Sequence, residues 1–233
     1  MRAGVIVGVI ALGLFLALQS CFGSSSTSWN QRLTLVIETP QGEVRGSAVM
    51  RVTKTETRGS LVLPEARGVR SEVTGEAVVV EVVPGRFLFA LLSGSDEEKR
   101  NATHWVYPAY QLGEASSFGG EMMKLLSQPL DTPVPLPPEG WPMLVTFDDI
   151  SKPETVRQVD PADLAAVFGA GARLQAVTLE ITEEAVTEGR VETLPFWKQL
   201  VEQRTFSGLH FFDPERPASL NYLTYDSLKM IKP

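Results

Sequence analysis

The sequence predicts an α+β fold built around an antiparallel or mixed β-sheet. Residues 32–128 show β-hairpin patterns, whereas short helix signals are interspersed through residues 143–233. A regular strand–helix–strand alternation is missing, which argues against a doubly wound fold. The chain has 233 residues, 43% of them hydrophobic, so it can bury a sizeable core. We expect the two segments to pack together as one domain.

The first hairpin is predicted from residue 32 onward. Apolar and polar residues alternate over residues 33–38 and again over residues 44–53, and residues 40–43 between them have turn chemistry. One face is therefore expected to be buried and the other exposed to solvent. The buried face would carry Leu33, Leu35, Ile37, Val44, Gly46, Ala48, Met50 and Val52. Residues 54–58 continue the alternation with exposed side chains, which is typical of a sheet edge or a hairpin arm.

A second hairpin is predicted over residues 73–83 and 86–92. Pro84 and Gly85 join the two segments, and this pair favours a type II turn because glycine accepts the positive φ at its third position. Both segments are apolar at nearly every residue, so we expect two central strands that are covered on both faces.

Three short helices are expected, each from apolar residues at helical spacing after a capping residue. The caps are Ser116 or Ser117, then Asp160 followed by Pro161 at the first helical position, then Thr193. The apolar faces would be formed, in chain order, by Phe118, Met122, Leu125 and Leu126; by Leu164, Val167 and Phe168; and by Phe196, Trp197, Leu200 and Val201. Residues 143–147 and 174–182 between these helices are predicted as strands.

Residues 129–142 contain six of the sixteen prolines and cannot form a regular helix or a central strand. Two interpretations stay open for this segment. It either connects a β-rich part, residues 32–128, to a mixed part, residues 143–233, or it is a surface loop of one domain.

The first twenty residues are expected to be a signal peptide. Residues 3–18 contain no charged or strongly polar side chain, and they are fewer than the roughly 20 residues that a membrane-spanning helix needs. The stretch ends in Leu18-Gln19-Ser20-Cys21, which resembles the lipobox of bacterial lipoproteins, although Gln19 departs from the usual small or aliphatic residue. An uncleaved anchor helix and an ordinary signal peptide cut near Ser20 are the two alternatives.

The lipobox resemblance implies cleavage before Cys21 and attachment of a diacylglyceryl group to its thiol, with an added acyl chain such as palmitate. Several acyl chains are enough for stable attachment to a membrane. Residues 21–31 would then be the lipidated cysteine and a flexible, serine-rich tether. The remainder of the protein is expected to face the periplasm.

The charge of the chain excludes some partners. The formal net charge is −7, and removal of residues 1–20, whose only charge is that of Arg2, leaves −8. A protein with this charge repels phosphate backbones, so we expect no nucleic-acid partner. We expect it to be attached to the membrane through the lipid on Cys21. The single cysteine excludes a disulfide framework and a multi-cysteine zinc site.

Six short segments of the chain resemble a group of uncharacterised proteobacterial envelope proteins. They are residues 39–42, 75–78, 144–149, 159–164, 168–171 and 177–182. That group has no assigned activity, so the resemblance implies a place in the bacterial envelope and no catalytic residue.

Few side chains suggest a metal site. His104 and His210 are the only histidines, and both are better interpreted as partly buried structural residues. A second interpretation is a cation site formed by Asp148 and Asp149, because calcium prefers carboxylate ligands. Glu154, Asp160 and Asp163 follow nearby, but their spacing does not match an EF-hand and several of them have capping or turn roles. No cofactor is expected.

The best enzymatic alternative is a serine hydrolase. Residues 115–119 resemble a variant nucleophile elbow centred on Ser117, and Asp148, Asp149 or Asp160 followed by His210 would complete the order serine, aspartate, histidine. A glycine-rich oxyanion-hole segment and a good central strand before the serine are both missing. Ser116 and Ser117 are more simply a helix cap.

The leading hypothesis is therefore a non-enzymatic binding or assembly module that is tethered to the membrane. Its partner would be another envelope protein or a small ligand in the crevice between sheet and helices. The aromatic tail could anchor a partner, but we expect it to complete the core. Its aromatic residues are Phe206, Phe211, Phe212, Tyr222 and Tyr225.

Overall fold

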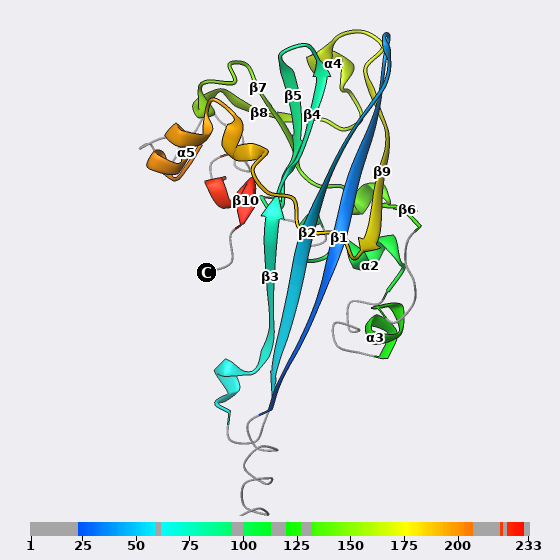
Figure 1. Ribbon diagram of the computed structural model, residues 1–233, viewed down its shortest axis with the longest axis vertical. Helices are drawn as coiled ribbons and strands as arrows, with labels where there is room; N and C mark the ends of the chain where they lie inside the picture. Colours follow the sequence, from blue (N-terminus) through cyan, green and yellow to red (C-terminus); the bar gives the residue numbers. More distant parts are fainter. Residues whose placement is uncertain are drawn as a thin grey trace, which may run out of the picture. The chain divides into compact units, whose positions relative to one another are not determined.

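The computed structural model describes residues 23–58, 62–94, 100–112, 120–126, 132–206, 220 and 223–230 (Figure 1). Antiparallel sheets dominate, hairpin strands come first and short helices come later, so the predicted α+β class is confirmed. Several residues with predicted roles lie outside the described residues. They are residues 1–20, Cys21, Ser116, Ser117, Phe118, His210, Phe211, Phe212 and Tyr222.

The chain divides into two compact units. The smaller unit comprises Met1–Ser28 and Thr53–Glu72, and the larger unit comprises Trp29–Val52 and Val73–Pro233. Three long strands, β1 (Gly23–Thr39), β2 (Gly42–Arg58) and β3 (Gly68–Glu76), contribute residues to both units. The proline-rich residues 132–142 belong to the larger unit throughout.

The described part of the smaller unit consists of strand ends and one 3₁₀ turn, Pro64–Ala66. β1 already begins at Gly23, so the prediction of a flexible tether over residues 21–31 is wrong for the residues that are described. The prediction that residues 54–58 are all exposed is wrong for Lys54, which is buried. Lys54 lies on the same face of β2 as Met50 and Val52, because side chains two residues apart share a strand face.

The first hairpin forms as predicted and is the centre of a six-stranded sheet with the order β10-β3-β2-β1-β9-β6. β9 (Arg173–Thr182) pairs antiparallel with β1, with Leu33 opposite Leu179 and Leu35 opposite Val177. The side chains of both pairs are buried. β6 (Val134–Pro135) and β10 (Lys229–Met230) are short strands at the two ends of this sheet.

The second hairpin also forms, but in a separate sheet. β4 (Val78–Val83) and β5 (Arg86–Ala90) pair antiparallel, and the positive φ of Gly85 confirms the predicted glycine position of the turn. With β7 (Leu144–Phe147) and β8 (Val156–Val159) they form a four-stranded sheet in the order β4-β5-β7-β8.

Two expectations for this hairpin are wrong. Residues 73–83 do not form one strand: β3 ends at Glu76 and β4 begins at Val78 in the other sheet. At the break, the backbone N–H of Ala77 donates to the carbonyl oxygen of Leu228 at 2.7 Å. β5 is central as predicted, whereas β4 lies at the end of its sheet in the described part of the chain.

Two cores cover the two faces of the four-stranded sheet. On one face, Val80 and Leu88 pack with Leu33, Met50 and their neighbours from the six-stranded sheet. On the other face, Phe89 and Phe147 pack with helix α5 (Trp197–Gln203) and the residues beside it. This second core contains a group of phenylalanine rings among aliphatic side chains. The ring centroids of Phe147 and Phe196 lie 4.5 Å apart in a stacked pair, and Phe206 joins them as expected for a core residue.

Two of the predicted helices differ in detail from the prediction. α4 (Ala165–Phe168) starts after Asp163 and not at Pro161, because Asp160 and Asp163 first form a turn. In α5, Phe196 and Leu200 are buried as predicted, but Val201 is 43% exposed. α3 (Gly120–Leu126) is present with Met122 buried.

The segment around His104, predicted as a strand or its end, is a turn that leads into the short helix α2 (Val106–Ala109). None of the described helices has the length and apolar character that a membrane span requires.

Candidate functional site

The predicted catalytic aspartate is engaged in a surface ion pair. The side chain of Asp148 is exposed, and its Oδ1 lies 2.8 Å from Nε of Arg157 on β8. Its proposed partners, Ser117 and His210, lie outside the described residues. The structure therefore gives Asp148 a local electrostatic role.

Three of the other predicted acidic residues each close a turn. Asp149 accepts hydrogen bonds from the backbone and the hydroxyl of Ser151, at 2.9 and 2.6 Å, and these bonds hold the pKa of Asp149 below its ordinary value. Asp160 accepts from the N–H of Ala162, and Asp163 accepts from that of Ala166. In the described ranges, three or more His, Cys, Asp or Glu side chains nowhere gather as a metal site, so the interpretation of Asp148 and Asp149 as a cation site finds no support.

His104 lies half-buried beside helix α2. Its Nδ1 is 2.9 Å from the hydroxyl of Thr103, and its ring centroid lies 5.8 Å from that of Tyr107. These neighbours hold the imidazole in place by local contacts, in keeping with a structural histidine.

A buried carboxylate that was not predicted is that of Glu76 at the end of β3. One oxygen accepts hydrogen bonds from the N–H of Gly189 at 2.8 Å and from Nζ of Lys229 at 2.9 Å. The other oxygen accepts from the N–H groups of Arg190 and Val191, at 2.8 and 3.2 Å. Each oxygen thus has two donors, so the carboxylate is fully satisfied.

The surroundings of Glu76 and Lys229 favour the charged forms of both side chains. Burial alone would raise the pKa of Glu76, but Lys229 and the three N–H groups outweigh it and hold that pKa below its ordinary value. Burial would likewise lower the pKa of Lys229, yet hydrogen bonds to Glu192 and Glu76 raise it above its ordinary value. The bond from Lys229 Nζ to Glu192 Oε1 is 2.7 Å long.

We interpret Glu76 as a structural clamp. It ties the loop at residues 189–191 and strand β10 to the end of β3, beside a cavity of about 490 Å³. A carboxylate with four donors has no acceptor position left for a substrate proton. The one sequence signal was the charged Glu76 inside the apolar run of residues 73–83, where Glu81 is the other charged residue.

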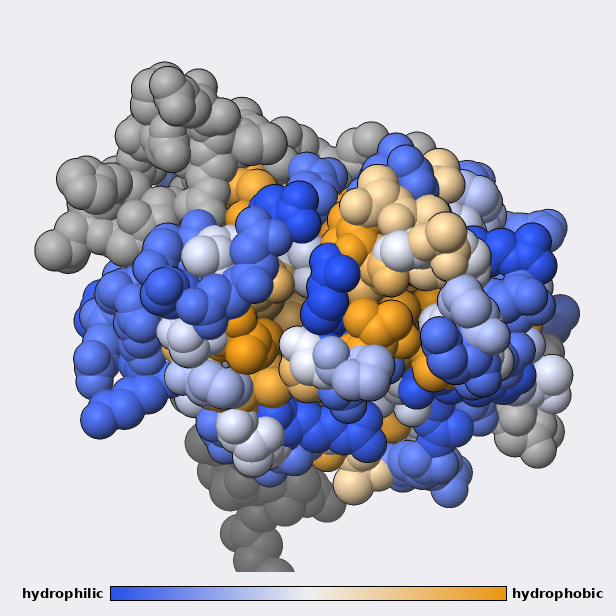
Figure 2. Space-filling view, turned by 90° about the horizontal axis from the view of Figure 1, so that it is seen from above, coloured by the Kyte–Doolittle hydropathy of each residue, from blue (hydrophilic) through white to orange (hydrophobic). Residues whose placement is uncertain are grey.

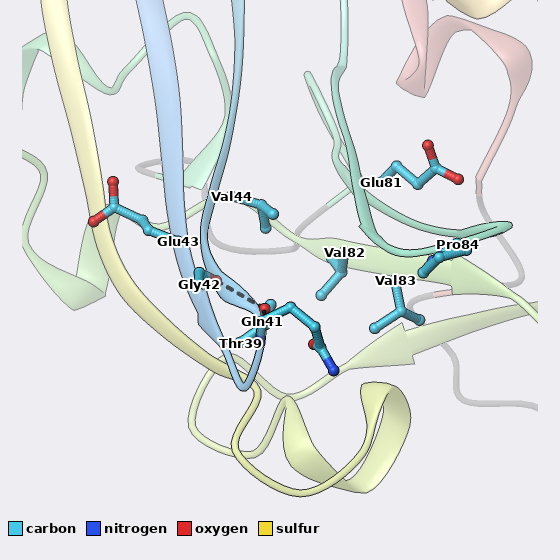
Figure 3. Close-up of a pocket in the computed structure, with 9 residues that line it drawn as sticks. All are labelled: Thr39, Gln41, Gly42, Glu43, Val44, Glu81, Val82, Val83 and Pro84. Carbon is cyan, nitrogen blue, oxygen red and sulfur yellow. Dashed lines mark hydrogen bonds between the residues drawn. The ribbon is translucent and has the colours of Figure 1, made fainter.

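The strongest candidate for a binding site is a groove of about 760 Å³ between the β1–β2 turn and the β4–β5 turn (Figure 3). We call it the hairpin groove. It is lined by Thr39, Gln41, Gly42, Glu43, Val44, Glu81, Val82, Val83 and Pro84. In the close-up, Val44, Val82 and Val83 point into the space between the hairpins, and the Gln41 side chain reaches across it.

A glycine sets the closed end of this groove. A Cβ atom on Gly46 would lie 2.4 Å from Cγ2 of Val80 and 2.8 Å from the carbonyl oxygen of Val79. β2 and β4 can therefore come together at Gly46 only because that residue has no side chain. The residues that line the groove follow this contact toward the two turns, at positions 39–44 and 81–84.

Both sides of the groove are fixed by hydrogen bonds within their turns. The Thr39 hydroxyl donates to the carbonyl oxygen of Gly42 at 2.7 Å, and Oε1 of Glu81 accepts from the N–H of Gly85 at 2.7 Å. Such turns hold their shape without a ligand, which lowers the entropic cost of binding.

The chemistry of the groove suits a ligand with an apolar group. The floor is formed by valine side chains, while the exposed carboxylates of Glu43 and Glu81 lie at its outer sides. Glu43 pairs with Arg45, whose Nε lies 2.5 Å away. Figure 2, which looks onto this end of the molecule, shows apolar residues in a hollow that hydrophilic residues surround. The side-chain amide of Gln41 adds a donor and an acceptor at the mouth.

No protein-family model matches this sequence, and the searches of curated proteins and of solved structures likewise found no match.

Proposed function

We propose that the protein is a lipoprotein of the bacterial envelope, anchored through Cys21, that acts as a non-enzymatic binding module. Its ligand occupies the hairpin groove and places an apolar group among Val44, Val82 and Val83. The groove carries this proposal, because concave apolar sites with a few polar groups are the usual form of ligand sites.

The position of the groove fits a tethered protein. β1 runs from Trp29, where the chain enters the larger unit, to Thr39 at the groove. At about 3.3 Å per residue this is roughly 33 Å of strand. The groove therefore lies about one strand length away from Trp29. Through Trp29 the larger unit is connected to an anchor at Cys21.

The anchoring is tested by Cys21→Ala in the full chain, followed by membrane fractionation. We expect the wild-type protein to be processed and membrane-bound, and the variant to lose lipid incorporation. A variant that stays uncleaved and membrane-bound, together with a wild-type protein that carries no lipid, would establish the anchor-helix alternative.

Binding in the groove is tested by placing a photoreactive amino acid at Gln41 in the full chain, with the same amino acid at Val201 as a matched control. Val201 is exposed on α5. We expect a discrete cross-linked species at position 41 that disappears when Val44→Lys introduces a charge into the groove, and no such species at position 201. Equal labelling at both positions would show that the groove is not a specific site.

A further inference from the structure

The described part of the smaller unit contains no buried apolar side chain. Every buried hydrophobic residue of the described chain lies in the larger unit, and Lys54 is the only buried residue described in the smaller one. Conversely, the smaller unit carries two of the three large apolar side chains that are exposed in the described chain, Leu63 at 64% and Val69 at 44%. These two apolar side chains therefore face outward.

The topology places these side chains beside the start of the described chain. β1 and β2 are joined by a two-residue turn, so the start of β1 lies next to the end of β2, and the hydroxyls of Ser26 and Thr55 are 3.2 Å apart. The connection from β2 to β3, which contains Leu63, leaves from that same end. Cys21 precedes the first residue of β1, Gly23, by two positions.

The charge of the smaller unit also differs from that of the rest. Residues 53–72 contain four basic and three acidic side chains, and residues 21–28 contain none, so this part has a net charge of +1. The chain from Cys21 onward carries −8, which leaves −9 on the larger unit. Anionic phospholipid headgroups therefore repel the larger unit, and of the two units only the smaller one is suited to approach them.

We propose that the smaller unit is a bilayer-contact surface in which Leu63 and Val69 enter the membrane interface while Arg67 and Arg70 face lipid phosphates. This inference rests on the proposed anchoring of the chain at Cys21. The apolar side chains, the positive charge and the anchor all lie in one unit. Arg70 pairs with Glu72 at 2.9 Å, but both side chains are largely exposed. Such a surface pair contributes little free energy, so the guanidinium can turn to a phosphate.

The contact is tested with the full chain in vesicles of phosphatidylethanolamine and phosphatidylglycerol. An environment-sensitive fluorophore is attached at Leu63→Cys and, as a matched control, at Val201→Cys. Lipids brominated along their acyl chains then quench any fluorophore that enters the bilayer. We expect strong quenching at position 63 and none at position 201.

The role of charge is tested in the same assay with Arg67→Glu/Arg70→Glu, and with Arg173→Glu as a control in the larger unit. We expect the double variant to reduce quenching at position 63 by about twofold or more, because basic side chains near an anionic surface attract the protein to it and acidic ones repel it. Arg173→Glu should leave it unchanged. Equal quenching of the double variant and the wild type would overturn the role given to the two arginines.

The outcomes separate this inference from the proposed function. A chain that floats with the vesicles but shows no quenching at position 63 keeps its anchor and overturns the bilayer contact. A blue-shifted but unquenched fluorophore would indicate that a protein surface, such as a second copy, covers Leu63, and would overturn it as well. A chain that does not float with the vesicles would contradict the anchoring itself.

Discussion

The larger and the smaller unit share three long strands, yet in the described part of the chain only the larger unit buries apolar side chains. In the larger unit, Leu33, Met50 and Val80 lie between two sheets and are almost wholly buried. In the smaller unit the same strands continue with threonine, serine and charged residues, and Leu63 and Val69 face outward. Strand pairing alone can therefore extend a sheet, whereas a hydrophobic core also needs a second layer of structure that packs on the sheet.

The largest expected effect concerns the buried ion pair of the larger unit. Glu76→Ala leaves Lys229 without one of its carboxylate partners and three backbone N–H groups without an acceptor. We expect the free energy of unfolding to fall by about 3–5 kcal/mol, measured by urea denaturation. Glu72→Ala in the smaller unit removes an exposed pair and should cost less than about 1 kcal/mol. Equal losses would mean that the two ion pairs are equivalent and would refute the clamp.

The next effect concerns the contact between the two sheets. Gly46→Ala places a methyl group 2.8 Å from the carbonyl oxygen of Val79, so β2 and β4 must move apart. We expect a loss of about 1–3 kcal/mol in the free energy of unfolding and a weaker photo-cross-link at Gln41.

The double variant Gly46→Ala/Val80→Ala is the control for this contact. It removes the methyl group that is closest to the new side chain, Cγ2 of Val80, but leaves the carbonyl contact. The effects of the two substitutions should therefore not be additive. A neutral Gly46→Ala would show that the groove has no closed end at this position.

The pH dependence of stability follows from the same ion pair. Because the pKa of Glu76 is lowered, its contribution is fully present above the ordinary glutamate pKa and is lost as the pH falls through the lower, folded value. Because the pKa of Lys229 is raised, its contribution is present below the ordinary lysine pKa and is lost as the pH rises through the higher, folded value. Urea midpoints measured across pH should therefore decline at both extremes, and Glu76→Gln should flatten the acidic decline relative to wild type.

The smallest effect on stability is expected in the smaller unit. Leu63→Ser should change the free energy of unfolding by less than about 0.5 kcal/mol, because the side chain is exposed and leaves no cavity. In the vesicle assay, with the fluorophore moved to Val69→Cys, the same substitution should reduce bromolipid quenching. A large loss of stability would show that Leu63 packs against the protein and that the smaller unit, like the larger one, buries apolar side chains.

Much of the secondary structure could be predicted from the sequence, and the elements predicted well share one property. The strands of the first hairpin, the turn at Gly85 and the strands at residues 144–147 and 173–182 depend on patterns within a few residues. At the break between β3 and β4, where the prediction was wrong, a contact between distant segments is formed. The β3–β4 break at Ala77 is fixed by a hydrogen bond to Leu228, and no local pattern marks it.

The candidate sites divide in the same way. The period-two alternation, the net charge and the position of Cys21 after an apolar stretch follow from the residue types and their order along the chain. The contact of Glu76 with Lys229, 153 residues away, and the position of Val44 and Val83 on one groove became evident only in the folded protein. Such pairings depend on how two sheets pack against each other, and hydrophobic burial, which drives that packing, has no direction of its own.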